Sequence, residues 1–291
     1  MPAADRAPSP HRPSPDDRVQ EREPSPDPRP QRPSPADGRQ AQQSPPDSAP
    51  RKYRQYRFSL PPGGADILLV RHGESQPATF DAPFPLVDGQ ADPALDPRGH
   101  TEAERVAARL AGQRLAAIYV TPLRRTAQTA APLAARLGLE PRVEPDLREV
   151  HLGEWEGATF RARVREGHPI ARRVFTEERW DVIPGAETME ALAARLRAGI
   201  GRIAAAHPDE RVAVFTHGGV IGMVVALATG GRPFAFIGAD NGSITHLVVC
   251  RGSGERADPR AGDGQGAWIV RRFNDTGHLA TDLDRPTQPL T

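Results

Sequence analysis

The sequence predicts an α/β domain, a three-layer sandwich in which a mostly parallel central sheet is flanked by helices and carries a cap-like insertion. Short apolar runs typical of buried strands alternate with longer segments whose apolar residues recur every three or four positions, as on one face of a helix. Strands and helices that alternate in this way pair as parallel strands joined by crossovers. Histidine and arginine residues directly after the strands mark the edge where such sheets collect their chemistry.

Five apolar runs predict the strands of the sheet. They read ADILLV (65–70), AAIYVT (116–121), RVAVFTH (211–217), SITHLVVC (243–250) and GAWIVRRFN (266–274). Each run is rich in β-branched residues or ends at glycine, proline or polar residues, as strands do. A loop rich in Gly, Asp and Arg, 251–266, is expected to join the last two strands as a hairpin.

Four segments with helical spacing lie between or before these strands. They cover residues 97–112, 122–138, 188–208 and 218–231. Pro132 removes a backbone donor inside the second segment, so we expect a kink or a break there. Residues 148–157 show neither a helical nor a strand period and are expected to form a loop. The arginine-rich stretch 159–188 is expected to form the cap-like insertion.

The two ends of the chain are expected to lie outside the domain, which covers residues 65–279. Residues 1–50 hold 14 of the 32 prolines and few large apolar residues, so they cannot bury enough surface to offset the entropy of ordering. We therefore predict a disordered proline-rich tail over 1–64 and a short C-terminal tail over 280–291. Two interpretations of the first tail stay open: a solvated extension, or a segment that docks partners through PxxP spacings or phosphorylated Ser-Pro sites.

Composition restricts the partners of this domain. The formal net charge of +1 over 291 residues gives no overall field that favours nucleic acid. The single cysteine, Cys250, excludes an internal disulfide. No apolar run approaches the about 20 residues of a membrane span, and the N-terminus lacks the apolar stretch of a secretory signal. We therefore expect a cytoplasmic protein with no membrane partner, and the sequence leaves open whether it forms a homodimer.

Two of the predicted strands end in a histidine that is followed by glycine. His72 stands beside Arg71 after the first strand, and Gly73 would let the backbone approach a ligand closely. His217 ends RVAVFTH, and Gly218 opens a helix whose N-terminus offers free N–H groups and a positive partial charge to an anion. Taken alone, a histidine at a strand end more often has a structural role.

A third junction between strand and helix carries Arg124 and Arg125 in TPLRRTAQT. If strand order makes the three junctions neighbours, two imidazoles and at least one guanidinium meet in a compact cationic site. A guanidinium matches a phosphoryl group with two parallel hydrogen bonds. A histidine among arginines has its cationic form disfavoured and stays neutral and nucleophilic. The pattern favours transfer of a phosphoryl group to nitrogen.

Five motifs resemble, in order, those of the histidine phosphatase superfamily, which has the phosphoglycerate-mutase-like fold: LLVRHGES, TPLRRTAQTA, LREVHLGEWEG, VAVFTHGGVI and NGSIT. The resemblance runs from about Asp66 to 273–279. It implies that His72 is the nucleophile and forms a phosphohistidine. Arg71 and Arg125, rather than Arg124, would bind the phosphoryl oxygens, and His217 would hydrogen-bond the transferring group.

The resemblance also implies an acid and a set of pocket residues. Glu149 in LREVHLG matches the carboxylate that protonates the leaving oxygen, a role that needs a raised pKa; the alternative is an ordinary surface carboxylate. Asn241, Gly73 and the backbone at Gly218 would line the pocket, and Ser75 would support the loop around the nucleophile. We expect neither a metal nor another cofactor, because no carboxylate cluster has metal-ligand spacing and the arginines would neutralise the charge.

The stretch after RHGES favours one activity over another. Cofactor-dependent phosphoglycerate mutases typically continue with Trp-Asn and an Asn-rich stretch, whereas this chain reads QPATFDAPFPLVDGQADPALDPRG. This passage resembles the phosphatase branch of the superfamily. We therefore expect a metal-independent phosphomonoester hydrolase, an acid-type histidine phosphatase that acts on a small phosphorylated metabolite. A phosphoglycerate mutase-type phosphotransferase and a non-catalytic phospholigand-binding module remain as alternatives, and arginines of the insertion could be solvated or could bind a second anionic group.

Overall fold

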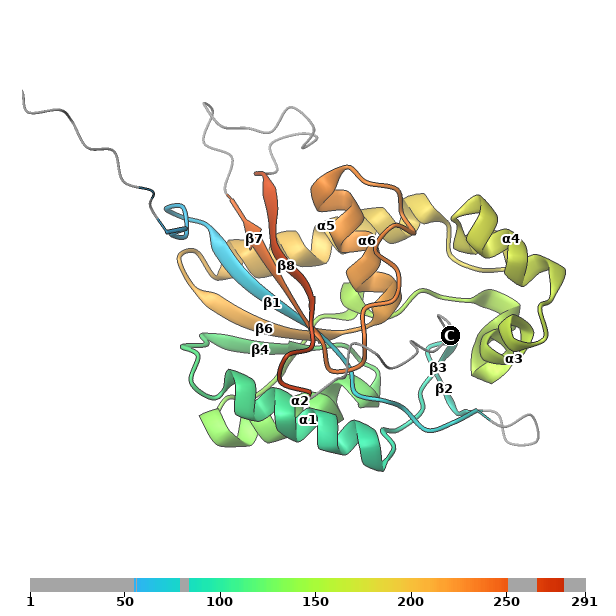
Figure 1. The fold of residues 1–291 in the computed structure, drawn as a ribbon, viewed down its shortest axis with the longest axis horizontal. Helices are drawn as coiled ribbons and strands as arrows, with labels where there is room; N and C mark the ends of the chain where they lie inside the picture. The colour runs from blue at the N-terminus through green and yellow to red at the C-terminus, as the bar shows by residue number, and fades with distance from the viewer. Residues whose placement is uncertain (1–54, 56, 79–83, 251–265, 280–291) are drawn as a thin grey trace, which may run out of the picture. The chain divides into compact units, whose positions relative to one another are not determined.

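The computed structural model of the protein describes residues 55, 57–78, 84–250 and 266–279. In this part of the chain a six-stranded sheet has the order β5-β4-β6-β1-β7-β8 (Figure 1). The first four strands in this order run parallel, whereas β7 is antiparallel to β1 and β8 to β7. The predicted, mostly parallel sheet is confirmed. Its strands are β1 (Ala65–Arg71), β4 (Ala117–Val120), β5 (Arg142–Val143), β6 (Arg211–Thr216), β7 (Ile244–Val249) and β8 (Trp268–Asp275).

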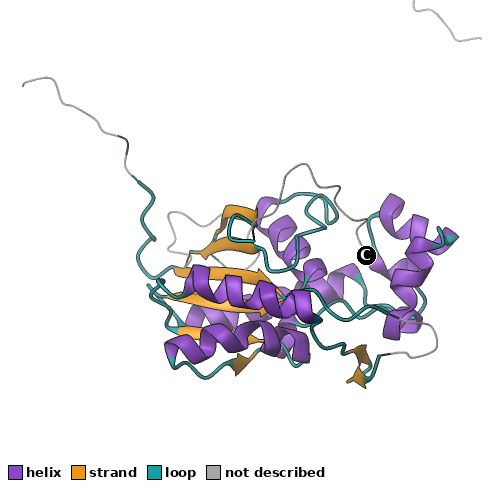
Figure 2. Cartoon of the chain, turned by 60° about the horizontal axis from the view of Figure 1, so that its bottom comes forward, coloured by secondary structure: helices purple, strands orange, loops and turns teal. Residues whose placement is uncertain are grey.

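Helices cover both faces of this sheet, α1 and α2 on one side and α5 and α6 on the other (Figures 1 and 2). Side chains alternate along a strand, so Val70 and Phe215 face the core under α1 and α2, whereas Leu69 and Val214 face the core under α5 and α6. This burial on both faces explains why the strands read as continuous apolar runs. The helices are α1 (Pro97–Leu110), α2 (Arg124–Leu137), α5 (Met189–Ala206) and α6 (Gly218–Thr229).

Local sequence sets where these helices begin and end. Asp96 and Thr188 cap α1 and α5, since each side chain accepts a hydrogen bond from a backbone N–H of the first turn, at 2.8 and 3.1 Å. Helices α2 and α6 end at Gly138 and Gly230, which have φ of 65° and 66°. Glycine adopts this left-handed conformation without strain, so it stops each helix cleanly.

Helix α2 runs through Pro132 to Leu137, so the predicted break is wrong. Pro132 lacks the N–H that would reach the carbonyl of Gln128, which costs the helix one hydrogen bond. Its neighbours Ala130 and Leu133 are both fully buried against the sheet. We attribute the continuity of the helix to this packing, because tertiary burial outweighs local propensity in most protein helices.

Several short elements are absent from the predicted set. Two are helical turns, η1 (Pro145–Leu147) and η2 (Gly153–Ala158), and η2 occupies the end of the stretch 148–157 that was expected to be a loop. Strand β5 has two exposed residues at the edge of the sheet, and a separate hairpin pairs β2 (Leu86–Val87) with β3 (Gln90–Ala91). Runs of two residues are too short to show a period of two. The hairpin turns at Asp88 and Gly89, whose φ angles of 48° and 80° fit the Asp-Gly turns that match strand twist. It brings the backbone of Gln90 and Ala91 toward the ends of the parallel strands.

The insertion over 159–188 forms two helices and a short helical turn, α3 (Thr159–Arg165), α4 (Pro169–Glu177) and η3 (Trp180–Val182). Aromatic rings hold it together: Phe160 lies 5.7 Å from Trp180, and Trp180 lies 4.9 Å from Phe234, between ring centroids. Rings at these separations gain contact energy beyond burial. The insertion is therefore a packed element that can present a side chain in a fixed place.

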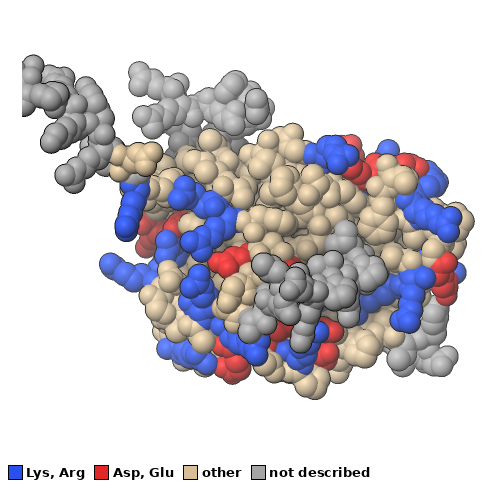
Figure 3. All heavy atoms as spheres, in the orientation of Figure 1, with Lys and Arg blue, Asp and Glu red and all other residues tan. Residues whose placement is uncertain are grey.

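Other predictions fall largely outside the described residues: the tail over 1–64, the hairpin loop 251–266 and the C-terminal tail over 280–291. The chain divides into two units, Met1–Gln55 and Tyr56–Thr291, and the helices and strands given above belong to the second. On the face drawn in Figure 3, basic and acidic side chains lie interspersed. Within the described ranges, no helix combines the length and the apolar character that a membrane crossing requires.

Candidate active site

Strand order brings the three predicted junctions together. β1 lies beside β6, and β6 lies beside β4, so the residues that follow these parallel strands are neighbours at one edge of the sheet. His72 and His217 follow β1 and β6, and their ring centroids are 5.2 Å apart. Arg125 lies in the first turn of α2, after β4, and is 7% exposed. The cationic site expected from the sequence is present.

The backbone around His72 holds its imidazole in one orientation. The ring is buried, and its Nδ1 lies 2.7 Å from the carbonyl oxygen of Gly73. A carbonyl only accepts, so Nδ1 carries the proton and the lone pair is on Nε2. Nε2 has no hydrogen-bond partner among the described residues. Asn241 donates from Nδ2 to the carbonyl of His72 at 2.8 Å and steadies this backbone.

Two buried polar atoms beside His72 lack partners in the described part of the chain. One is Nδ1 of His217, whose Nε2 contacts the hydroxyl of Thr121 at 3.0 Å. The other is Nε of Arg71, which donates from Nη1 to the carbonyl of Ala239. Leaving a buried polar atom without a partner costs about 1–3 kcal/mol. An oxyanion bound here would accept from Nε of Arg71, and from Nδ1 of His217 in the tautomer whose Nε2 accepts from the hydroxyl of Thr121.

The electrostatics keep the imidazoles neutral and the guanidiniums charged. Burial, followed by the charges of Arg125 and Arg71, lowers the pKa of His72 well below its ordinary 6.5. Burial and Arg125 also lower the pKa of His217 in the same way. Burial lowers the pKa of Arg125 to about 10 and also lowers the pKa of Arg71, so both arginines remain cationic near neutral pH. The site offers a neutral nucleophile among fixed cations.

Glu149 lies in the loop before η2 and reaches the N-terminus of α6. Its Oε2 accepts from the N–H of Gly219 at 3.4 Å, and its Oε1 accepts from the N–H of Val150 at 3.0 Å. The side chain is half-buried, and its charge raises the pKa of both Arg71 and Arg125. Glu149 is thus one of the charged groups of the site and not an ordinary surface carboxylate.

The two glycines that follow the histidines, Gly73 and Gly218, lie where a Cβ would meet a neighbouring group. The N–H of Gly73 donates to the hydroxyl of Thr129 at 3.0 Å, and a Cβ on Gly73 would lie 2.5 Å from the carbonyl oxygen of Gly99. Gly73 therefore permits close packing of two backbones, which is a structural reason for glycine beside the nucleophile. A Cβ on Gly218 would lie 3.2 Å from Nε of Arg71, so this glycine leaves room for the guanidinium.

Arg161 of α3 is a third guanidinium at the site that the sequence did not single out. It donates from Nη2 to the hydroxyl of Ser75 at 2.9 Å and from Nη1 to the carbonyl of Gln76 at 3.3 Å. Burial lowers its pKa, and its charge helps to lower the pKa of His72. The insertion carries several arginines, and only the fold shows which one turns toward the nucleophile loop. Other contributors missed from the sequence are Gln90, Thr121, Arg195 and Gly219.

No group of three or more His, Cys, Asp or Glu side chains that could hold a metal ion occurs in the described ranges. The charged groups that act on the two imidazoles include Arg71, Arg125 and Arg161, and Glu149 acts in turn on Arg71 and Arg125. Such a set can bind an oxyanion through guanidinium groups, offer a ring nitrogen to it and hold a carboxylate nearby. These are the requirements for moving a phosphoryl group.

Comparison with known proteins gives several relatives of similar sequence. The chain is 38% identical over 163 residues to phosphoglycerate mutase-like protein 4 of Arabidopsis thaliana, covering 54% of this chain and 68% of that protein. It is 32% identical to the glucosyl-3-phosphoglycerate phosphatase of Mycobacterium tuberculosis, over 55% of this chain and 73% of the relative. It is 30% identical to a metal-independent phosphoserine phosphatase of A. thaliana, over 74% and 84%.

Solved structures agree with these relatives. The native mycobacterial glucosyl-3-phosphoglycerate phosphatase matches the fold with a TM-score of 0.59 and 29% identity, over 72% of this chain and 99% of that one. The model of the histidine phosphatase superfamily (branch 1) matches residues 67–257, which include His72, Arg125, Glu149 and His217. The chain belongs to the histidine phosphatase superfamily, as its ordered motifs predicted.

Proposed function

We propose that the protein is a phosphomonoester hydrolase that works through a phosphohistidine at His72. One observation carries the proposal: two side chains next to His72 each have a buried nitrogen without a partner among the described residues. They are Arg71 (Nε), the preceding residue, and His217 (Nδ1), whose ring centroid is 5.2 Å from that of His72. A bound phosphoryl group would give both atoms their partner. It would also stand opposite the nitrogen that can attack it, held by the guanidinium of Arg125.

The first step transfers the phosphoryl group to the histidine. Nε2 of His72 attacks phosphorus, and the bond from phosphorus to the leaving oxygen breaks as the new bond forms. Glu149 in its protonated form gives a proton to that oxygen, so an alcohol leaves rather than an alkoxide. Arg71 and Arg125 stabilise the charge on the phosphoryl oxygens in the transition state, and the fixed positions of both groups avoid reorganisation.

The second step returns the histidine to its starting form. Glu149, now a carboxylate, accepts a proton from a water molecule as the water oxygen attacks phosphorus. The bond between Nε2 and phosphorus breaks, inorganic phosphate leaves, and the proton on Glu149 is ready for the next cycle. The hydrogen bond from Nδ1 of His72 to the carbonyl of Gly73 keeps the same ring orientation throughout.

We expect this cycle to run without a metal ion, since guanidinium groups supply the positive charge that the phosphoryl oxygens require. The relative at 30% identity whose name is metal-independent phosphoserine phosphatase supports this part of the proposal. The test is phosphate release from phosphomonoesters in EDTA. Unchanged rates are expected; activity that vanishes in EDTA and returns with a divalent metal would contradict the proposal.

For the substrate we propose a small phosphorylated metabolite that carries a second anionic group. The two phosphatase relatives are named for phosphoserine and for glucosyl-3-phosphoglycerate, and both molecules carry a carboxylate near the phosphate. Arg161 is the guanidinium in the insertion that could meet such a group, as it is anchored beside the nucleophile loop. A panel of matched phosphomonoesters with and without the carboxylate tests this, and equal kcat/KM within the pairs would contradict it.

A phosphoglycerate mutase is the second candidate, favoured by the relative at 38% identity whose name is mutase-like. A mutase keeps its phosphoryl group from water and returns it to the substrate. A coupled mutase assay with and without 2,3-bisphosphoglycerate, run beside a phosphate-release assay, separates the two activities. We expect release of phosphate to dominate. Docking of partners by the proline-rich tail, a homodimer and a cytoplasmic location stay predictions.

The lowered pKa of His72 predicts activity below pH 6.5, as in an acid-type phosphatase. Because burial and two arginines disfavour the imidazolium, Nε2 stays nucleophilic at a pH where free histidine is protonated. The unfolded chain takes up this proton first, so the free energy of unfolding falls as the pH drops below about 6.5. Rates and melting temperatures measured from about pH 8 to about pH 4 test both effects. An activity loss centred at the ordinary histidine value would contradict the assignment.

The substitution Gly219→Ala tests the position assigned to Glu149, the proposed general acid. A Cβ at this position would lie 2.7 Å from Oε1 of Glu149 and 2.9 Å from Cγ2 of Val150, so the carboxylate must move. Because general acid catalysis contributes about 10²–10⁴-fold, we expect kcat for an alkyl phosphate to fall by about tenfold or more. Gly201→Ala is the matched control, since a Cβ there meets nothing within 4 Å. Equal activity of the two variants would contradict the assigned position of Glu149.

A further inference from the structure

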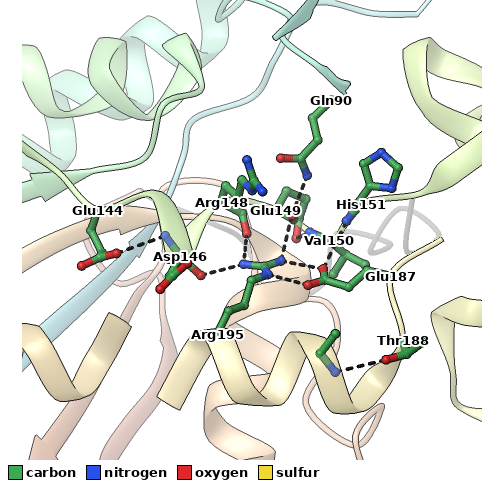
Figure 4. A network of polar contacts seen from close by, with 11 residues as sticks. Gln90, Glu144, Asp146, Arg148, Glu149, Val150, His151, Glu187, Thr188 and Arg195 are labelled. Atoms are coloured by element: carbon green, nitrogen blue, oxygen red, sulfur yellow. Dashed lines mark hydrogen bonds and ion pairs between the residues drawn. The ribbon is translucent and has the colours of Figure 1, made fainter. Parts of the chain in front are cut away.

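Arg195 of α5 holds the backbone that carries Glu149 (Figure 4). Its Nη1 donates to the carbonyls of Asp146 and Arg148 at 2.6 and 2.7 Å, and its Nη2 donates to the carbonyl of Glu149 at 3.0 Å. The remaining donors pair with Glu187, Nε with Oε1 at 2.6 Å and Nη2 with Oε2 at 2.8 Å. A guanidinium has five N–H groups, and all five are used. Arg195 therefore has no donor left for a substrate.

The carbonyls of 146–149 depend on such contacts because no regular element pairs them. The short helical turn Pro145–Leu147 uses only the carbonyls of Glu144 and Pro145 for its own backbone hydrogen bonds, and residues 148 and 149 belong to no helix or strand. Thr216 of β6 donates from its hydroxyl to the carbonyl of Leu147 at 2.7 Å, and Gln90 of β3 donates from Nε2 to the carbonyl of Glu149 at 2.7 Å. With the two carbonyls bound by Nη1 of Arg195, four consecutive carbonyls are held by side chains. Only Arg195 binds three of the four.

The ion pair with Glu187 fixes Arg195 in turn. The side chains of Arg195 and Glu187 are 14% and 13% exposed, so water screens this pair far less than a surface pair. Glu187 is itself bound to the loop, since its N–H donates to the carbonyl of His151 at 2.9 Å. The pair thus binds the loop on both sides of Glu149: Arg195 of α5 binds it from the carbonyl of Asp146 onward, and Glu187 binds the carbonyl of His151.

We propose that Arg195, oriented by Glu187, is a positioning residue that sets the carboxylate of Glu149 against the leaving oxygen of the substrate. The proposal rests on the acid role given to Glu149 above. A carboxylate displaced by about 1 Å can cost on the order of 10²-fold in rate, so the geometry of the loop is worth fixing with many hydrogen bonds. Arg195 offers no free hydrogen-bond donor to the phosphoryl group.

The dependence of the rate on the leaving group distinguishes a positioning role of Arg195 from a merely structural one. p-Nitrophenolate leaves without a proton, whereas a primary alkoxide needs one, so loss of the acid slows alkyl phosphates far more than p-nitrophenyl phosphate. The variants are Arg195→Lys, whose ammonium cannot reproduce the planar fork of donors, and Glu187→Gln. Arg202→Lys is the matched control: it lies on the same helix and pairs with the side chains of Glu144 and Asp146. Glu149→Gln and the double variant with Arg195→Lys complete the set, and melting curves show that each protein folds.

We expect Arg195→Lys and Glu187→Gln to lower kcat/KM for O-phosphoserine or another active alkyl phosphate by about tenfold or more. The comparison uses kcat/KM because it reports the first step, whereas kcat also contains the second step, in which Glu149 acts on water for either substrate. For p-nitrophenyl phosphate we expect less than about a threefold change, and for Arg202→Lys no change with either substrate. In the Glu149→Gln background, Arg195→Lys should add almost nothing, because both changes remove the same function.

Three results would overturn the inference, and they differ from one another. Equal losses on both substrates, or losses that multiply with those of Glu149→Gln, would make Arg195 a structural residue and leave the proposed hydrolase intact. A Glu149→Gln variant without leaving-group dependence would remove the acid role itself, and the inference with it. If Arg195→Lys does not fold, Glu187→Gln decides by the same comparison, and an unselective effect there overturns the proposal.

Discussion

Replacement of His72 by alanine is expected to abolish phosphomonoester hydrolysis, with kcat/KM lower by about 10³-fold or more. The variant lacks the nitrogen that attacks phosphorus. The second imidazole of the site, His217, remains, and its proposed role is to hydrogen-bond the transferring group and not to attack it. The loss should be the same for p-nitrophenyl phosphate and for alkyl phosphates, because both require the same attack. Initial rates under saturating and limiting substrate measure kcat and kcat/KM separately.

His100→Ala is the control for this variant, because His100 is exposed on α1 and lies outside the site. It should retain full activity. Melting curves should show that His72→Ala still folds, with a lower melting temperature, since the variant loses a buried ring and leaves the carbonyl of Gly73 without its partner. Activity of His72→Ala within tenfold of the unchanged protein, about 1.4 kcal/mol, would exclude a phosphohistidine at this position.

The second large effect is expected for Arg125→Lys, with kcat/KM lower by about 10²–10³-fold. The guanidinium of Arg125 is anchored by one hydrogen bond, from Nη1 to the carbonyl of Ala91 at 2.9 Å, which leaves its other donors for the phosphoryl oxygens. An ammonium keeps the charge but loses the two parallel hydrogen bonds that a phosphoryl group accepts. The measurement is kcat/KM with p-nitrophenyl phosphate, which does not depend on the acid.

The neighbouring arginine provides the control. Arg124 is paired with Asp92, with Nε 2.7 Å from its carbonyl oxygen and 3.1 Å from Oδ2, and its side chain is 44% exposed, so its charge is compensated and screened by water. Arg124→Lys should leave kcat/KM within about threefold, as expected for a partly exposed ion pair. Equal losses in the two variants would show that charge alone matters here, and a larger loss for Arg124 would reverse the assignment made from the motif.

Much of the fold could be predicted from the sequence because its strands are buried on both sides. The apolar run that ends at Arg71 and the alternation of strands with helices required no knowledge of distant contacts. The two-residue strand at Arg142 and the hairpin at Gln90 could not be predicted, since they exist through pairing and turn geometry rather than through a pattern of their own. Helix α2 continues through Pro132 because tertiary packing outweighs a local rule.

The site likewise contains some residues that could be predicted from the sequence and others that could not. Arg71, His72 and His217 stand at strand ends, so parallel strand order alone brings them together. Glu149 had to be assigned from the resemblance, because its loop has no period and is held by Arg195, 46 residues along the chain. Arg161 approaches Ser75 across 86 residues, so nothing near either one in sequence predicts the contact. Contacts between residues that are far apart in the sequence cannot be predicted before the fold is known.

The most direct test of the account is the identity of the phosphorylated atom during turnover. Rapid mixing with substrate, quenching in base and mass spectrometry of the peptides should find a phosphoryl group on His72, stable in base, lost in acid and formed within the first turnover. The Glu149→Gln variant should still form it from p-nitrophenyl phosphate. Steady release of phosphate with no phosphoryl group on His72, or with one on another residue, would contradict the account.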